Sequence, residues 1–161
     1  MDTLFLHPDG QGRVAAWGRE AGVIQTLGVH ELASLAERYA GARVVLFVPS
    51  SQCLLTRVTI SARQRRQAAD ALGWLIEEQV GEDVENLHVI AGPEQPDGDT
   101  PLLAIAAETI EYWRKVCRDS GWALHALLPD LLLLPQADGT WCLTRWADGS
   151  VAIRTGMLAG A

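Results

Sequence analysis

The sequence predicts an α/β fold: a mixed sheet flanked by helices, followed by the start of a second β-meander. Short apolar stretches separated by turn residues open the chain over residues 1–28. Arg43–Val48 is a continuous apolar run after its first residue, which is typical of a strand buried on both faces. Beyond it, helical apolar stripes alternate with strand patterns as far as residue 128, as expected when helices pack on a sheet.

The first part of the chain reads as three short strands and a helix. Pro8-Asp9-Gly10 and the stretch from Gly18 to Gly22 carry the residues that favour turns. The expected strands are Thr3–Leu6, Arg13–Trp17 and Val23–Leu27. Apolar residues at helical spacing then predict a helix over Glu31–Tyr39, and Gly41 is suited to end it.

The middle of the chain alternates between strands and helices. Ser61 and Gln64 form a capping-box pattern at the start of the longest predicted helix, which runs to Val80. A polar loop without periodicity is expected over Gly92–Pro101, and Gly121 is expected to end the second long helix. The expected elements are strand Cys53–Ile60, helix Ser61–Val80, strands Leu87–Ala91 and Leu102–Ala107, helix Thr109–Ser120 and strand Trp122–Leu128.

The last part of the chain reads as a second meander. Ala147-Asp148-Gly149 predicts a tight hairpin between strands Thr140–Trp146 and Val151–Thr155. Leu132–Leu134 followed by Asp138-Gly139 also matches Leu4–Leu6 followed by Asp9-Gly10. Either this is an internal repeat or two meanders share the same turn chemistry. We therefore expect a first lobe over residues 1–128 and the opening of a second, truncated lobe over 129–161.

Composition excludes several classes of protein. With 13 Lys+Arg against 20 Asp+Glu, the net charge of -7 argues against nucleic-acid binding, which depends on cations facing phosphates. The one lysine, Lys115, has no glycine near it, so the chain lacks the lysine of a phosphate-binding P-loop. Three widely spaced cysteines form neither a disulfide framework nor a paired metal motif. No signal peptide or membrane span is visible, so we expect a soluble, cytoplasmic piece of chain.

Several local strings, in their order along the chain, resemble a known family. The most specific is Glu77-Glu78-Gln79 followed by Asp83-Val84-Glu85 and Leu87-His88. The others are Leu46-Phe47-Val48-Pro49, Leu128-Pro129-Asp130 and Arg154-Thr155-Gly156. Together they resemble the cytoplasmic domain of type II secretion system protein L. The order of elements likewise resembles the actin-like, ribonuclease-H-like fold, with the strands at Cys53 and Leu102 as insertions.

The resemblance implies a scaffold without catalytic activity. Members of that family recruit the secretion ATPase, protein E, to the inner-membrane platform, and their full-length chains also contact proteins M and F. It implies that the longer protein crosses the inner membrane once and that this part lies on the cytoplasmic face, and it allows a homodimer. No cofactor, metal or nucleic acid is expected. The alternative is a degenerate actin-like domain that binds a nucleotide or serves a type IV pilus assembly.

The sequence lacks the catalytic and metal-binding motifs that enzymes of this fold use. An actin-like ATPase needs an acidic residue and backbone donors at the first turn, but Pro8 removes one donor beside Asp9. A nuclease of the ribonuclease-H type needs carboxylates on its central strands to bind metal ions, and Arg43–Val48 has none. The four histidines are far apart in sequence, and no catalytic serine motif is present.

One charge pattern predicts a partner surface. Arg63, Arg65 and Arg66 crowd the start of the predicted Ser61–Val80 helix, and Glu77 and Glu78 its end, opposite to what the helix dipole favours. Glu82, Asp83 and Glu85 extend the acidic end. Solvent screening allows a helix to tolerate such charges. As a pattern, however, they favour a contact with the ATPase through one end of the helix or through the acidic Glu77–Glu85 corner.

Overall fold

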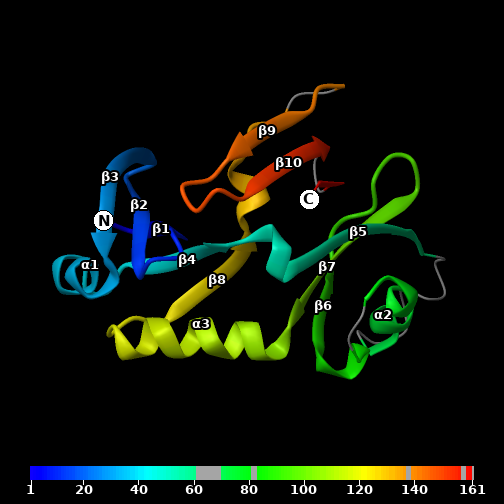
Figure 1. Cartoon of the computed structure of the whole chain (residues 1–161), viewed down its shortest axis with the longest axis horizontal. Helices are drawn as coiled ribbons and strands as arrows, with labels where there is room; N and C mark the ends of the chain where they lie inside the picture. The colour runs from blue at the N-terminus through cyan, green and yellow to red at the C-terminus, as the bar shows by residue number, and fades with distance from the viewer. Residues whose placement is uncertain (61–69, 81–82, 137–138, 157–158, 161) are drawn as a thin grey trace.

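The computed structural model describes the chain except for residues 61–69, 81–82, 137–138, 157–158 and 161. Its strands form three sheets; in Figure 1 the long helix α3 runs along the bottom and the C-terminal strands β9 and β10 lie at the top. The largest has the strand order β3-β2-β1-β4-β8. Its members are β1 (Thr3–Pro8), β2 (Arg13–Glu20), β3 (Val23–Glu31), β4 (Arg43–Val48) and β8 (Leu124–Pro129). The first three are antiparallel, whereas β4 and β8 run parallel to β1, as the actin-like prediction requires.

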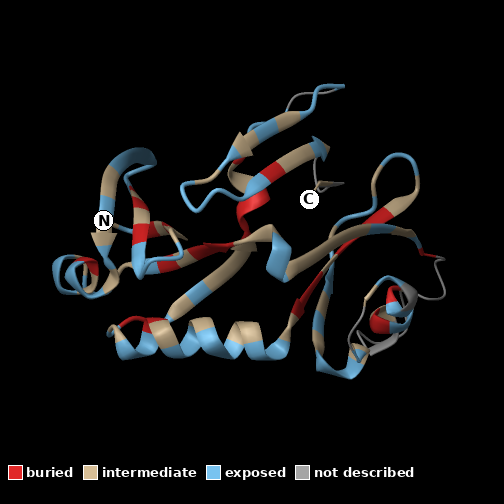
Figure 2. Ribbon diagram, viewed as in Figure 1, coloured by how far each residue is buried: buried red, intermediate tan, exposed pale blue. Residues whose placement is uncertain are grey.

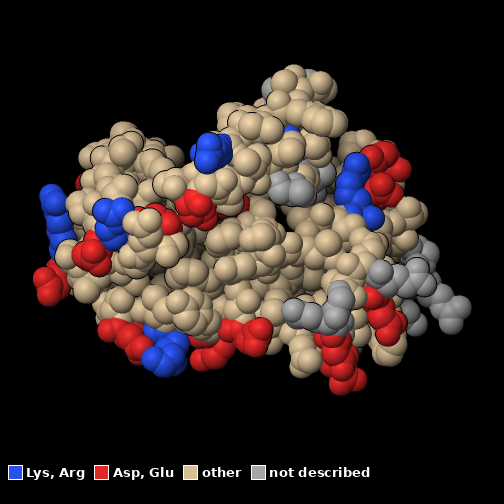
Figure 3. Space-filling model, in the orientation of Figure 1, with Lys and Arg blue, Asp and Glu red and all other residues tan. Residues whose placement is uncertain are grey.

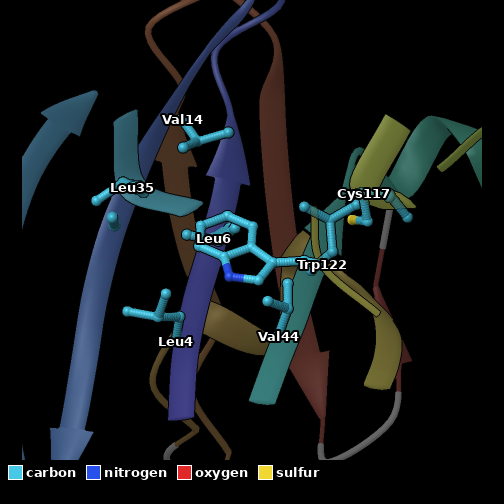
Figure 4. Close-up of a cluster of buried hydrophobic side chains, with 10 residues drawn as sticks. Leu4, Leu6, Val14, Leu35, Val44, Cys117 and Trp122 are labelled. Carbon is cyan, nitrogen blue, oxygen red and sulfur yellow. The ribbon is translucent and has the colours of Figure 1, made fainter. Parts of the chain in front are cut away.

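Two helices pack against one face of this sheet. They are α1 (Leu32–Arg38) and α3 (Ala107–Asp119). Alternate residues of the strands point toward them, because successive side chains of a strand face opposite sides. The resulting core includes Leu4, Leu6 and Val44, which are fully buried, together with Cys117 and Trp122 from the end of α3 and beyond. Figure 4 shows the Trp122 ring among these strand side chains.

The third strand is longer than predicted because it continues through a glycine. Gly28 was expected to close the strand, but it lies inside β3 with a φ of 97°. The register shifts between Ala16 and Trp17, which pair with Gly28 and Thr26, so Leu27 is an extra residue. This is a β-bulge, and glycine is the residue that adopts its positive φ without strain.

A second sheet is inserted between β4 and β8 along the chain. It consists of β5 (Cys53–Thr59), β6 (Leu87–Ala91) and β7 (Asp99–Ala106) in the order β5-β7-β6. The short helix α2 (Asp70–Trp74) packs near it, and the core between them contains Ile60, Ile76 and Leu102. The predicted insertions at Cys53 and Leu102 are thus confirmed as one three-stranded unit, which lies on the right in Figure 1.

Two predictions in this insertion were wrong. The helix predicted to reach Val80 ends at Trp74, where the backbone tightens: the Leu75 and Ile76 amides donate to the Leu72 and Gly73 carbonyls at 3.2 and 3.1 Å. Gly73 weakens the helix at this point, because glycine is a poor helix former. The chain then leaves the helical path so that the Ile76 side chain can be buried.

The predicted loop over Gly92–Pro101 is also shorter than expected. Asp99, Thr100 and Pro101 belong to β7 because they pair with Thr59, Val58 and Arg57 of β5.

The C-terminal part differs from a copy of the first meander. Leu132 and Leu133, which the repeat would place in a strand, belong to the 3₁₀ helix η5 (Asp130–Leu133). The hairpin of β9 (Cys142–Arg145) and β10 (Val151–Gly156) is confirmed, with β11 (Ala159–Gly160) beside β10. Leu131, Leu134 and Ala152 form its small core, and Figure 2 shows η5 as a buried segment beneath this sheet. The strand that would begin a repeat is therefore replaced by a 3₁₀ helix, and Asp138 of the matching turn lies outside the described residues.

Candidate partner-binding site

The structure describes only part of the predicted partner surface. Arg63, Arg65, Arg66 and Glu82 lie outside the described residues, as does the side chain of Glu78. Glu77, Asp83 and Glu85 are described, and all three are exposed. Glu77 and Glu78 were interpreted as the end of one continuous helix. They instead lie in the separate 3₁₀ helix η3 (Glu77–Gln79), so the argument from the dipole of a single helix does not apply to them.

Buried neighbours fix the position of these carboxylates. Ile76 is fully buried just before η3, and the Thr56 hydroxyl of β5 donates to Gln79 Oε1 at 2.8 Å. The second 3₁₀ helix, η4 (Val84–Asn86), begins with Asp83 as its cap: Asp83 Oδ1 accepts from the Glu85 amide at 3.3 Å. Both short helices are thus anchored to the insertion while their carboxylates face solvent.

An exposed tryptophan adjoins these carboxylates. The Trp74 side chain is 64% exposed and, with Val84, Glu85 and His88, lines a hollow of about 580 Å³. Sequence reasoning missed Trp74, because attention went to the apolar stripe of the predicted helix. A large aromatic residue off that stripe was the available signal. We call Trp74, Glu77, Asp83 and Glu85 the acidic corner.

In the part of the chain that the structure describes, no cation forms an ion pair with the carboxylates of the acidic corner. Among the described residues, Glu77, Asp83 and Glu85 take part in no ion pair, whereas Arg57 pairs with Asp97 at 2.6 Å and Arg118 approaches Glu111 at 3.9 Å. Figure 3 shows carboxylates gathered at the lower right, over the part of the molecule that carries α2 and β6. Tryptophan is one of the residues in which interface hot spots are enriched.

A second polar cluster lies where the parallel strands β1, β4 and β8 end. Asp130 accepts hydrogen bonds at Oδ1 from the Ser50 amide (2.9 Å) and hydroxyl, and its Oδ2 lies 3.3 Å from His7 Nε2. Burial alone would raise the pKa of Asp130, but the bonds from His7 and Ser50 outweigh it, so the pKa is lowered from 3.8. The carboxylate therefore stays charged, with its side chain 3% exposed.

This cluster does not have the geometry of a serine hydrolase. In that triad the histidine bridges serine and carboxylate, so that it can take the hydroxyl proton. Here Asp130 lies between the other two, and the Ser50 hydroxyl donates to the carboxylate itself. Ser50 Oγ also accepts from the Leu131 amide at 3.1 Å. The cluster joins the ends of three strands, and we assign it a structural role.

In the turns at Asp9 and Asp148, where an actin-like ATPase would bind phosphate, the carboxylates are already hydrogen-bonded to residues of the same turn. Asp9 accepts from the amides of Gln11 and Arg13 and from the Arg13 side chain, and Asp148 accepts from both the amide and hydroxyl of Ser150. These bonds hold the pKa of each carboxyl below its ordinary value. The two turns lie close together, since a Cβ added to Gly10 would lie 3.9 Å from that of Asp148. A phosphate would meet two carboxylates there, and within the described residues no group of three metal-binding side chains surrounds them.

Comparison with known proteins identifies the family. The family model for type II secretion system protein L matches residues 17–159. The chain belongs to this family. Protein L of Klebsiella pneumoniae is 32% identical over 117 residues, which cover 73% of this chain and 28% of that protein. Protein L of Pseudomonas aeruginosa is 28% identical over an alignment that covers 96% of this chain and 41% of that protein. The chain thus spans less than half the length of these relatives.

Solved structures agree on the fold. The cytoplasmic domain of EpsL, an inner membrane component of the type II secretion system of Vibrio cholerae, superposes with a TM-score of 0.72 at 18% identity. The match covers 96% of this chain and 71% of that one. A PilM–PilN type IV pilus biogenesis complex matches with a TM-score of 0.59 at 14% identity, covering 96% of this chain and 61% of that one. Both likenesses concern the fold alone.

These findings confirm the predicted family and the actin-like α/β fold. As a member of the protein L family, the chain belongs to a type II secretion system. The relatives that it matches are named as secretion components and not as enzymes. In the described part of the chain, no helix is long and apolar enough to cross a membrane.

Proposed function

We propose that this chain is a docking domain that recruits the secretion ATPase, protein E, to the cytoplasmic face of the inner membrane. Membership of the protein L family supports a place in the secretion platform. The two lobes, residues 1–128 and 129–161, would act as a scaffold without catalytic activity. Contacts with proteins M and F, and a homodimer, would belong to the longer chain.

The acidic corner is the surface that we assign to the ATPase. Its support is the combination of a 64% exposed Trp74 with carboxylates that no described cation neutralises. A partner with a basic patch and an apolar pocket would bury the indole ring and pair with Glu77 and Glu85. Tryptophan is among the residues that contribute most to binding energy when an interface excludes water around them.

The test is co-purification and calorimetric titration of the chain with the N-terminal domain of protein E. Trp74→Ala should weaken binding by about 2 kcal/mol or more, close to thirtyfold, if the ring is a hot spot. Charge reversal of Glu77, Asp83 and Glu85 to lysine should weaken binding further and reverse its salt dependence, because salt would then screen a repulsion.

Tyr112→Ala is the matched control. Tyr112 is 59% exposed on α3, away from the acidic corner, so its removal should leave binding unchanged. A separate triple variant of Arg63, Arg65 and Arg66 to glutamate tests the other predicted surface. Full binding by the acidic-corner variants would contradict our assignment, and weakened binding by the arginine variant alone would move the contact there.

Nucleotide binding remains the competing function and has a direct test. A ligand that binds the folded state raises its unfolding temperature by mass action. We expect no shift with ATP and magnesium, because Asp9 and Asp148 already accept hydrogen bonds from residues of their own turns. A rise that depends on ATP concentration would favour the nucleotide-binding alternative.

A further inference from the structure

The face of the large sheet opposite α1 and α3 is apolar, and among the described residues it is covered only in part, by the end of η5 and by Trp146. The register places Phe5 beside Trp17 and Val45, so the three side chains share this face. His7, two residues further along β1, and Phe47, two residues after Val45 in β4, lie on the same face because side chains alternate along a strand. In α/β folds both faces of such a sheet are normally covered, and an apolar patch left exposed on one of them marks an interaction site.

This face is hollowed into a groove of about 510 Å³. Phe5, Trp17 and Phe47 form the floor, and the Phe5 and Phe47 ring centroids lie 6.4 Å apart. Leu132–Leu134 and Trp146 form one wall. The opposite side is open at the edge strand β3, where Ile24 is 63% exposed. The groove is therefore walled on the side of the C-terminal sheet and open toward β3.

Arginines mark one end of the groove. Arg19 and Arg43 flank Thr3 in the register, and both are exposed. The Arg19 guanidinium lies 5.9 Å from the Phe5 ring centroid and donates to Thr3 Oγ1 at 3.2 Å. Neither arginine pairs with a carboxylate of the described residues. In a chain of net charge -7, two unpaired cations beside an apolar floor favour an occupant that carries carboxylates.

We propose that this groove docks an amphipathic helix of a partner protein, with an apolar stripe on the floor and carboxylates over Arg19 and Arg43. A helix lays apolar residues spaced three and four apart into such a groove, and arginine binds a carboxylate through two parallel hydrogen bonds. This surface differs from the acidic corner in position and in the sign of its charge. It is therefore independent of the site assigned to the ATPase.

Two fluorescein-labelled helical peptides test the proposal by anisotropy. They share one leucine-rich stripe and differ only at its flanks, which carry glutamate in one peptide and lysine in the other. We expect the glutamate peptide to bind at least about tenfold more tightly than the lysine peptide. The double variant Arg19→Glu and Arg43→Glu should reverse that preference, and Ile24→Glu should weaken both peptides. Arg118→Glu on α3 is the matched control and should change neither.

Three outcomes would overturn the proposal. One is equal affinity for both peptides, or none for either. The second is a dimer in light scattering that Ile24→Glu dissociates, which would make a second copy the occupant. The third is a longer form of the chain in which Trp17 fluorescence is protected from an added quencher with no partner present. Further residues of the same chain would then be the occupant of the groove. Loss of protein E binding would not be expected from any of these variants, so failure here is distinguishable from failure of the ATPase site.

Discussion

Replacing Asp130 by alanine tests how much the cluster at the strand ends contributes to stability. The carboxylate accepts hydrogen bonds from the Ser50 amide, at 2.9 Å, and from the Ser50 hydroxyl. Its other oxygen, Oδ2, lies 3.3 Å from His7 Nε2. A hydrogen bond to a charged group contributes about 1.5–3 kcal/mol, and a buried donor left without an acceptor costs about 1–3 kcal/mol. Because these terms overlap at one site, we expect Asp130→Ala to lower the free energy of unfolding by about 3 kcal/mol.

Urea denaturation and thermal unfolding measure this loss. For a chain of this size, about 3 kcal/mol corresponds to a fall of about 6–12 °C in the midpoint temperature. Asp130→Asn keeps the shape and one neutral acceptor, so its loss should be smaller. The control is Asp148→Ala, which removes an exposed turn carboxylate and should cost much less.

The effect of Asp130 should also depend on pH. Its pKa is lowered in the folded protein, so its stabilisation is fully present above the ordinary value of 3.8 and is lost as the pH falls through the lowered pKa. The difference between wild type and Asp130→Ala should therefore be constant at neutral pH and shrink below about pH 4. A loss under about 1 kcal/mol, or a difference that persists in acid, would refute the reasoning.

Three further predictions concern other parts of the fold. Burial, and then the charge of Asp130, raise the pKa of the Cys53 thiol to about 12. Because the thiolate is the reactive form, mass spectrometry should find Cys53 resistant to iodoacetamide at mildly alkaline pH until urea unfolds the chain. Rapid labelling of the folded protein would contradict this. Ile76→Ala should cost about 2–4 kcal/mol and raise hydrogen exchange in β6 and β7 more than in β1 and β4; a uniform rise would argue against a separate core in the insertion. Gly28→Ala should cost about 1 kcal/mol in urea denaturation, because a Cβ has room there and only the φ of 97° is unfavourable; an unchanged midpoint would count against the bulge.

Local patterns were sufficient for most of the elements. The turn residues of Pro8-Asp9-Gly10 and Ala147-Asp148-Gly149 predicted two hairpins correctly, because turn conformations are decided by the residues that occupy them. The apolar run of Arg43–Val48 predicted a strand buried on both faces, and β4 is an interior strand between β1 and β8 whose residues are mostly buried. The periodicity of Thr109–Ser120 gave α3 within two residues of its observed ends.

The rest depends on contacts between distant residues. Asp130 meets Ser50 and His7 across separations of 80 and 123 residues, which no local motif records. The helix predicted to reach Val80 stops at Trp74 because Ile76 is drawn into the core of the insertion. Trp74 lies off the apolar stripe of the predicted helix, which hinted at its exposure, but only the folded structure shows that it shares a hollow with Glu85.

The insertion joins the large sheet without a flexible loop on one side. β7 ends at Ala106 and α3 begins at Ala107, and the Cys117 side chain near the other end of that helix is fully buried. The helix has 13 residues and so spans about 20 Å. The other link passes through Ser50, which the Asp130 carboxylate holds in place. The insertion is thus rigidly connected to the large sheet through α3. We expect a rotation of the insertion, such as a partner bound at Trp74 would cause, to rotate α3 and the core residues that it carries.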